Sequence, residues 1–240
     1  MASRDACATL REASGYAAIG ETIAAARLAE SDTFWSHYYP PGLLLDRSKP
    51  WPYKNHAAER ILDSMAPRSM VDLACNAGWY SQVGALKGID VIALDADETC
   101  VNRLFDAAAS GLHPIVAGVA DICAPISLAG PVQPTGLDAG MRFASELALA
   151  LAISHHLVLS PPWLTFDELA NLLARYTTRY LLTEFIGFGP EFENPYSAAD
   201  YPEATEWYTL DNFVLALGRR FREVVLVPGP PGRRLVLAEK

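Results

Sequence analysis

Apolar and polar positions follow two alternating periods along the chain, and this predicts an α/β fold built on a mostly parallel sheet. Short apolar runs, typical of buried strands, lie at 70–73, 90–94, 113–117, 147–153, 180–185, 221–227 and 233–238. Helical spacing predicts helices at 55–65, 97–109 and 209–219, and two more beginning near 79 and 165. The turn at 228–233 joins the last two strands into an antiparallel hairpin. We therefore expect seven strands with helices on both faces.

Two aromatic stretches interrupt this pattern. Residues 3–30 have helical periodicity, and residues 31–54 add many rings and four prolines, so we expect a helical and aromatic cap over 1–54 before a domain at 55–240. A second aromatic and acidic insert covers 187–208 and is too long for a plain connection. These rings either cover a ligand or dock the cap on the core. Those that we assign to ligand contact are Trp35, Tyr39, Tyr53, Phe188 and Tyr196.

Composition narrows the class of protein. The 240 residues are 51% apolar, which suits one α/β domain with a small appendage. The net charge of −9 argues against a nucleic-acid partner. The four cysteines lack metal-ligand spacing, so we expect reduced thiols and no metal site. Charged residues near the start argue against a signal peptide, and no apolar run spans a bilayer, so we expect a cytoplasmic protein without membrane contact.

The segment MVDLACNAGWYS at 70–81 is the candidate ligand-binding motif. A buried strand carrying Asp72 is followed by a turn of small residues and then by a helix. Small residues let a ligand approach the backbone, and Gly or Asn can adopt a positive φ there. The unpaired amides of the following helix then face the ligand. We therefore place a binding site over Ala74, Asn76 and Gly78.

The second strand indicates what that ligand contains. It ends on Asp95, next to Ala96, where an acidic side chain can accept hydrogen bonds from ribose hydroxyls. The pair of features predicts an adenosine-containing ligand. A dinucleotide fingerprint would need GxGxxG, whereas this turn keeps only Gly78.

With these residues in place, the chain from about residue 55 to its end resembles the class I S-adenosylmethionine-dependent methyltransferases, which have a Rossmann-like seven-stranded sheet. Asp72 matches the acidic position of their first motif and Gly78 its last glycine, while Ala74 and Asn76 stand where glycines are commoner. The words ALALAISHHL and YLLTEF are similar to those of a NoeA-like subset of methyltransferase-like proteins. The resemblance implies S-adenosylmethionine as cofactor.

The resemblance also implies further site residues. Asp121 matches the side chain that binds the adenine amino group, and Ile122 is expected to pack on the ring. The fourth strand ends in Ser154, His155 and His156, and ligands of parallel sheets bind beyond the carboxyl ends of strands. We expect Ser154 at the cofactor.

For catalysis, we expect one of His155 and His156, near its ordinary pKa, to take a proton from the acceptor. Because side chains alternate along a strand, only one of the two would point to the cleft, and His155 is slightly preferred. Glu184, near the end of the fifth strand, is a second candidate base or an anchor for an amine. A purely structural role for either ring remains open.

The predicted function is S-adenosylmethionine-dependent methyl transfer to a small-molecule hydroxyl, amine or carbon, in a biosynthetic pathway. Two alternatives stay open: a non-methylating or regulatory S-adenosylmethionine-binding protein, and a nucleotide-dependent oxidoreductase. A homodimer is compatible with the sequence.

Overall fold

The computed structural model describes residues 32–39, 51–110, 114–123, 139–189, 196–228 and 232–240. Contacts divide the chain into Met1–Asp32 and Thr33–Lys240, and the fold given below is that of the second unit. The helices predicted at 3–30, and the parts of the aromatic stretches at 40–50 and 190–195, lie outside the described residues.

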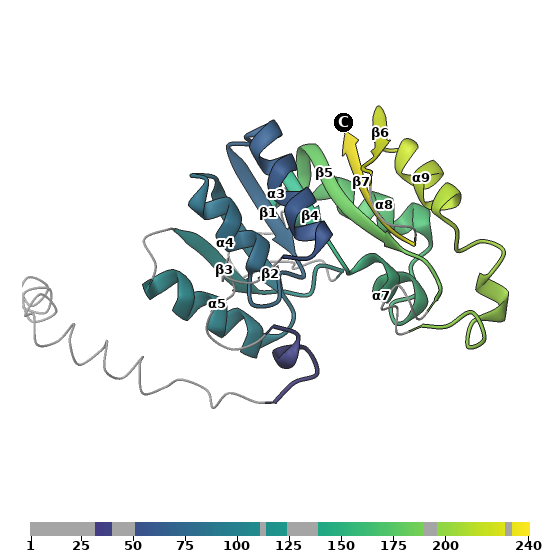
Figure 1. The fold of residues 1–240 in the computed structure, drawn as a ribbon, viewed down its shortest axis with the longest axis horizontal. Helices are drawn as coiled ribbons and strands as arrows, with labels where there is room; N and C mark the ends of the chain where they lie inside the picture. The colour runs from purple at the N-terminus through teal and green to yellow at the C-terminus, as the bar shows by residue number, and fades with distance from the viewer. Residues whose placement is uncertain (1–31, 40–50, 111–113, 124–138, 190–195, 229–231) are drawn as a thin grey trace, which may run out of the picture. The chain divides into compact units, whose positions relative to one another are not determined.

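One seven-stranded sheet forms the centre of this unit, in the order β3-β2-β1-β4-β5-β7-β6 (Figure 1). The first five strands are parallel: β1 (Ser69–Leu73), β2 (Asp90–Asp95), β3 (Ile115–Val119), β4 (Ser145–Ala150) and β5 (Thr177–Ile186). Strand β7 (Arg233–Glu239) lies between β5 and β6 (Glu223–Leu226) and is antiparallel to both. The mostly parallel sheet with a C-terminal antiparallel hairpin is thus confirmed.

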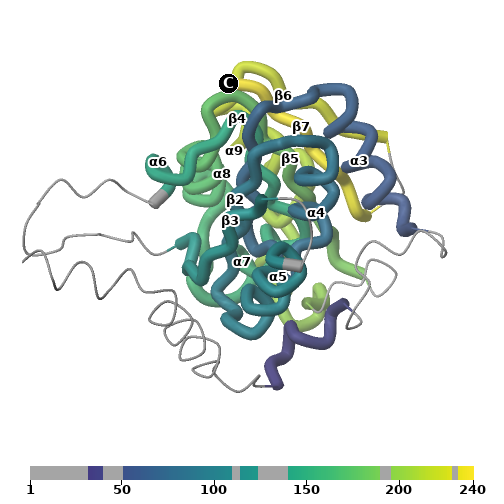
Figure 2. The backbone as a smooth tube through the Cα atoms, turned by 90° about the vertical axis from the view of Figure 1, so that its left-hand side faces the viewer, coloured from purple at the N-terminus to yellow at the C-terminus, as the bar shows by residue number. Residues whose placement is uncertain are grey.

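Helices cover both faces of the sheet (Figures 1 and 2). On one face lie α3 (Tyr53–Met65), α4 (Trp79–Leu86) and α5 (Glu98–Ser110), which pack on strand residues such as Met70 and Ala93. On the other face lie α7 (Ser154–Leu159), α8 (Phe166–Arg175) and α9 (Leu210–Gly218). The short α6 (Ala139–Phe143) contacts α8, and two 3-10 turns, η1 (Trp35–His37) and η3 (Pro202–Ala204), complete the described elements.

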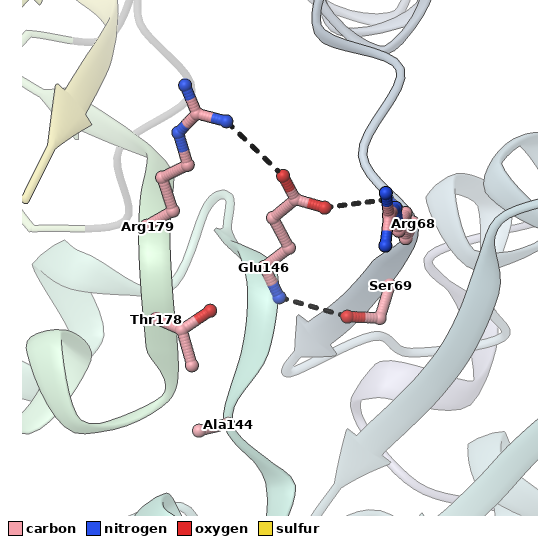
Figure 3. A pocket seen from close by; sticks show the side chains of 6 residues that line it. All are labelled: Arg68, Ser69, Ala144, Glu146, Thr178 and Arg179. Atoms are coloured by element: carbon pink, nitrogen blue, oxygen red, sulfur yellow. Dashed lines mark hydrogen bonds and ion pairs between the residues drawn. The ribbon is translucent and has the colours of Figure 1, made fainter.

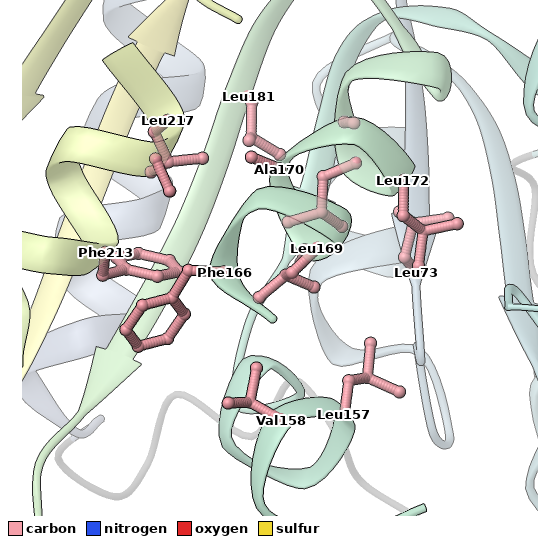
Figure 4. Packing of buried hydrophobic residues seen from close by; sticks show 14 of the residues in the cluster. Leu73, Leu157, Val158, Phe166, Leu169, Ala170, Leu172, Leu181, Phe213 and Leu217 are labelled. Atoms are coloured by element: carbon pink, nitrogen blue, oxygen red, sulfur yellow. The ribbon is translucent and has the colours of Figure 1, made fainter. Parts of the chain in front are cut away.

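The larger core lies between the sheet and α7, α8 and α9 (Figure 4). Helix α8 begins where the sequence predicts, because Thr165 and Glu168 form a capping box. Its buried face places Phe166 and Leu169 among residues of the sheet and of α9, such as Leu181 and Phe213. This packing fixes the carboxyl ends of β4 and β5 against α7.

Several strand boundaries differ from the predicted ones. Strand β4 ends at Ala150 rather than 153, because the backbone turns at Ala152, whose φ is 55°, and Ser154 then begins α7. The apolar run continues past the strand because α7 also needs buried residues. Strand β3 lies two residues later than predicted, and its pairing with β2 sets that register. Strand β6 is shorter than predicted because Phe221 packs in the core against α9.

None of the helices in the described ranges is long and apolar enough to cross a membrane.

Candidate active site

The turn after β1 follows a glycine-like path although it holds one glycine. The φ angles of Ala74, Asn76 and Gly78 are 55°, 51° and 78°, all in the left-handed region. An added Cβ on Gly78 would lie 2.4 Å from the Leu104 side chain, so no other residue fits there without movement. The left-handed conformation therefore costs up to about 2 kcal/mol each at Ala74 and Asn76, and less at Asn76 because Asn tolerates it better.

Asp72 lies beneath this turn and is buried at 2% exposure. Its carboxylate accepts a hydrogen bond of 2.6 Å from the Ser81 hydroxyl, at the start of α4. Burial raises the pKa of Asp72 to about 7, against the opposing effect of the Ser81 bond. The acidic residue of the motif thus ties β1 to α4 and can change its charge near neutral pH.

Asp95, at the end of β2, is held in place by the backbone. Its two carboxylate oxygens accept bonds from the amides of Asn76, at 2.7 Å, and Asp97, at 2.8 Å. Burial nevertheless raises its pKa above the usual value. Because each carboxylate oxygen has two lone pairs, acceptor capacity remains for a ribose hydroxyl. The neighbouring Ala96 is exposed beside it.

Residues 33–39, which we call the N-terminal strap, bind to the same turn. The Asn76 side chain donates to the Trp35 carbonyl at 3.0 Å, and the Thr33 hydroxyl donates to Asp97 at 2.5 Å. Arg103 on α5 donates to the Ser36 carbonyl. The contacts of Thr33 and Arg103 were not predicted, because the partners are more than 60 residues apart and nothing in the local pattern connects them.

The strap also reaches the histidine pair. The Trp35 ring lies edge-to-face on His156, with centroids 5.0 Å apart, and the His155 and His156 rings are 4.0 Å apart. His156 Nδ1 is 3.0 Å from the Tyr196 hydroxyl. Both histidines lie in the first turn of α7 and not at a strand end, so the alternation expected for a strand does not apply.

The histidines are neutral and weakly basic in this environment. Burial, then the neighbouring His156 and the charges of Arg233 and Lys54, lowers the pKa of His155 to about 2. Burial alone lowers the pKa of His156 to about 4. His155 is only 3% exposed, and its Nδ1 atom has no hydrogen-bond partner among the described residues. The ordinary pKa expected from the sequence is therefore wrong, because that expectation left out desolvation.

Glu184 is buried at 1% exposure and accepts several contacts. One oxygen accepts from Arg233 Nε at 2.9 Å, and the other from the Ala152 amide at 2.9 Å, with Lys54 Nζ at 3.7 Å. These partners hold the carboxylate in place, and the bond to the Ala152 amide anchors the turn before α7.

Nearby, the Ser154 hydroxyl lies 3.2 Å from that of Thr183, with Ser154 only 2% exposed. Both side chains are thus held within the protein at the carboxyl ends of β4 and β5.

The remaining predicted residues lie in three other environments. Asp121 is exposed beyond β3 and accepts from the Cys123 amide at 2.9 Å, while Ile122 is 7% exposed in the larger core. Phe188 packs on Tyr208, with ring centroids 5.0 Å apart. Tyr53 donates its hydroxyl to the Pro228 carbonyl.

Tyr39 is largely buried near the charges of Asp72 and Glu184, and burial raises its pKa above the usual range. The structure therefore gathers the strap, the turn after β1, the histidine pair and the Glu184 cluster at the carboxyl edge of the sheet. Phe188 packs elsewhere, in the core beside α9.

A shallow depression lies at the opposite, amino edge of the sheet (Figure 3). It is lined by Arg68, Ser69, Ala144, Glu146, Thr178 and Arg179. The Glu146 carboxylate is already held by the Arg68 amide at 2.9 Å and by Arg179 at 3.5 Å. Since ligands of parallel sheets bind at the carboxyl ends of strands, the candidate active site is the group of residues at the other edge.

Comparisons with known proteins bear on the fold. No protein-family model and no curated protein matches the sequence. Among solved structures, WbdD, described as a bifunctional kinase-methyltransferase, has a TM-score of 0.55 at 18% identity, covering 91% of this chain and 48% of that one.

Two further structures have similar scores. EvdMO1 has a TM-score of 0.53 at 15% identity, covering 84% of this chain and 49% of that one. TehB from Haemophilus influenzae has a TM-score of 0.50 at 13% identity, covering 82% and 65%. The chain thus spans about half the length of WbdD and EvdMO1. At these identities the likeness is one of fold, and the fold is the Rossmann-like methyltransferase fold.

Proposed function

We propose that this protein binds S-adenosylmethionine and transfers its methyl group to a small-molecule acceptor. The observation that carries the proposal is the backbone path of the turn from Ala74 to Gly78, which joins β1 to α4. Ala74 and Asn76 adopt the left-handed conformation usually left to glycine, so the chain keeps this backbone path despite its cost. The path brings backbone close to any ligand over β1, which is the place a nucleoside cofactor takes in this sheet.

The residues present fit this cofactor. Asp95 is oriented by two turn amides and retains acceptor capacity for ribose hydroxyls. Trp35 and Asn76 close one side of the turn, and Asp121 stands free of the core beyond β3, where we place the adenine. The cofactor supplies an activated methyl group on a sulfonium. The chain itself has to hold an acceptor in line with that methyl and exclude water.

The histidine pair and Tyr196 are the groups that we assign to the acceptor side. Because both rings stay neutral near pH 7, they offer lone pairs or N–H donors without positive charge. The Tyr196 hydroxyl already pairs with His156 Nδ1, so it positions the ring. We infer that this pair orients an acceptor hydroxyl or amine. Glu184 is engaged with Arg233 and the Ala152 amide, so we propose an anchoring role for it rather than proton transfer.

The first test is calorimetry with S-adenosylhomocysteine on three proteins. The wild type is expected to bind. Asp95→Asn removes half of the acceptor capacity at the ribose and should weaken binding on the order of tenfold. Asp90→Asn, on an exposed residue at the other end of the same strand, is the matched control and should bind like wild type. A folded wild-type sample that gives no heat at millimolar ligand contradicts the proposal.

A second candidate is a protein that binds S-adenosylmethionine without methylating. The observation that favours it is the low basicity of both histidines, because a general base works best when its pKa is near the working pH. Release of S-adenosylhomocysteine in the presence of an acceptor distinguishes the two. If a His156→Phe variant retains cofactor binding and loses that release, the methyltransferase proposal holds. Cofactor binding with no turnover for any acceptor class supports the second candidate.

A further inference from the structure

The start of helix α3 places a cation at the carboxyl edge of the sheet. Lys54 is the second residue of this 13-residue helix, and its side chain is only 17% exposed. Its ammonium lies 3.7 Å from Glu184 Oε2, which is beyond hydrogen-bond distance, and no shorter contact of this group is found among the described residues. A largely buried ammonium has three donors to satisfy. The structure thus leaves donor capacity at this point.

Glu184 does not accept a hydrogen bond from the Lys54 ammonium. Its two oxygens are held by shorter bonds from Arg233 Nε and the Ala152 amide, both at 2.9 Å. The Glu184 carboxylate therefore lies near both Arg233 and Lys54 and is closer to Arg233. Lys54 is held near Glu184 by charge, and its ammonium makes no hydrogen bond to Glu184 at this distance.

The helix itself adds to the positive potential. The N-cap of α3, Pro52, makes no side-chain capping bond, and the first turn holds no acidic residue. Unpaired first-turn amides and the helix dipole favour an anion at such an end. The Tyr53 hydroxyl, bonded to the Pro228 carbonyl after β6, holds this end of the helix to the sheet edge.

A second group at the same edge also lacks a partner. His155 Nδ1 is buried and without a hydrogen bond among the described residues. His155 follows three residues after Ala152, whose amide donates to the same Glu184 oxygen that lies 3.7 Å from the Lys54 ammonium. The charges of Lys54 and Arg233 also contribute to the lowered pKa of His155. Buried polar atoms are almost always paired, so an unpaired one in a native structure points to a missing partner. A neutral imidazole can donate from Nδ1 to an anionic oxygen.

We propose that Lys54, the start of α3 and His155 form a binding site for a carboxylate or phosphate group of a bound ligand. The inference rests on the proposed function for the identity of that ligand. Two bound molecules can supply such a group: the cofactor, through its amino-acid carboxylate, or the acceptor. Strand β4 lies between β1, which leads into the turn at Ala74–Gly78, and β5, which carries Glu184.

The experiment compares wild type with Lys54→Met, Lys54→Arg and the control Lys87→Met, which removes a lysine of the same size from the end of α4. Circular dichroism and thermal unfolding first establish that each variant is folded. Calorimetry then measures binding of S-adenosylhomocysteine and of 5′-methylthioadenosine, which lacks the amino-acid carboxylate. Inorganic phosphate and benzoate are titrated into both the free protein and its S-adenosylhomocysteine complex.

We expect Lys54→Met to weaken binding of at least one anionic probe on the order of tenfold or more, while Lys54→Arg and Lys87→Met bind like wild type. Weaker S-adenosylhomocysteine with unchanged 5′-methylthioadenosine identifies the cofactor carboxylate as the occupant. Unchanged S-adenosylhomocysteine with weaker phosphate or benzoate identifies an anionic acceptor.

Equal affinities of wild type and Lys54→Met for every probe overturn the proposal. If the wild type binds no S-adenosylhomocysteine, the proposed function fails. The titrations of phosphate and benzoate into free protein still decide the anion site in that case.

Discussion

Ala74 and Asn76 show how single residues keep a backbone path that their side chains disfavour. Both have a positive φ, and Ala74 has no side-chain bond that would repay its strain. We predict that Ala74→Gly leaves the free energy of unfolding unchanged or raises it by up to about 1 kcal/mol, because relief of strain outweighs the added freedom of the unfolded chain. Urea unfolding measures this.

The matched control is Ala77→Gly in the same turn, where φ is not positive and the side chain is buried. It gains nothing from glycine and should lose about 1 kcal/mol. An equal loss in both variants would show that the left-handed conformation at Ala74 carries no strain.

Asp72 predicts an unusual dependence of stability on pH. Its pKa rises from 3.8 in a model peptide to about 7 in the fold, so the folded state binds the proton more tightly than the unfolded state. The contribution of Asp72 to stability is therefore full below about pH 4 and is lost as the pH rises through about 7, at up to roughly 1.4 kcal/mol per pH unit.

We test this with Asp72→Asn, which keeps an acceptor for the Ser81 hydroxyl. The free energy of unfolding of wild type minus that of Asp72→Asn should fall between about pH 4 and about pH 7. The difference between the proteins cancels the opposite contribution of the two histidines, whose lowered pKa values destabilise the fold on acidification. A difference that does not change with pH would show that Asp72 titrates normally.

At the scale of elements, the N-cap residue Thr165 sets the start of helix α8. The Thr165 hydroxyl accepts from the Glu168 amide at 3.2 Å, and Glu168 accepts from the Thr165 amide at 2.8 Å. We predict that Thr165→Ala lowers the free energy of unfolding by about 1 kcal/mol, since it leaves a helix amide without its cap. Thr165→Ser retains the hydroxyl and should lie near wild type in the same urea titration. A similar loss in Ser and Ala would assign the effect to the lost methyl group.

Local sequence patterns predicted some boundaries of the helices and strands and missed others. Strands β1, β2 and β5 and the cap of α8 follow from local apolar patterns and were predicted. The end of β4 was not, because an apolar run does not distinguish a strand from the buried helix that follows it. His155 and His156 were therefore found as candidates by position but placed on the wrong element.

The site contacts that the sequence did not predict join residues that are far apart in the chain. Lys54 pairs with Glu184 across 130 positions of sequence, and the strap meets Asp97 and α5 across more than 60. No local pattern encodes such pairs. The depressed pKa values of the histidines have the same origin, since burial is set by the packed α7 and the strap together.

At the scale of the whole molecule, the order of strands in the sheet favours binding of S-adenosylmethionine over binding of a dinucleotide by an oxidoreductase. Strand β7 is antiparallel between β5 and β6, and the turn after β1 has only one glycine, Gly78, where the dinucleotide fingerprint needs three. The turn after β1 and the histidine pair, which follows β4, lie at the ends of neighbouring strands of one sheet. A ligand that spans both is expected to stabilise the whole fold, not only one loop.

Thermal unfolding with and without ligand measures this coupling. At roughly 100 times its dissociation constant, a ligand that binds only the folded state adds about 2.7 kcal/mol, which for a chain of this size raises Tm by roughly 5 to 10 °C. We predict such a shift with S-adenosylhomocysteine and none with NADH, because the turn carries no site for a pyrophosphate. The Asp95→Asn variant, at the same ligand concentration, should show a smaller shift, since its ribose contact is weakened. A larger shift with NADH than with S-adenosylhomocysteine would instead favour an oxidoreductase, and an Asp95→Asn shift equal to that of wild type would remove Asp95 from the cofactor site.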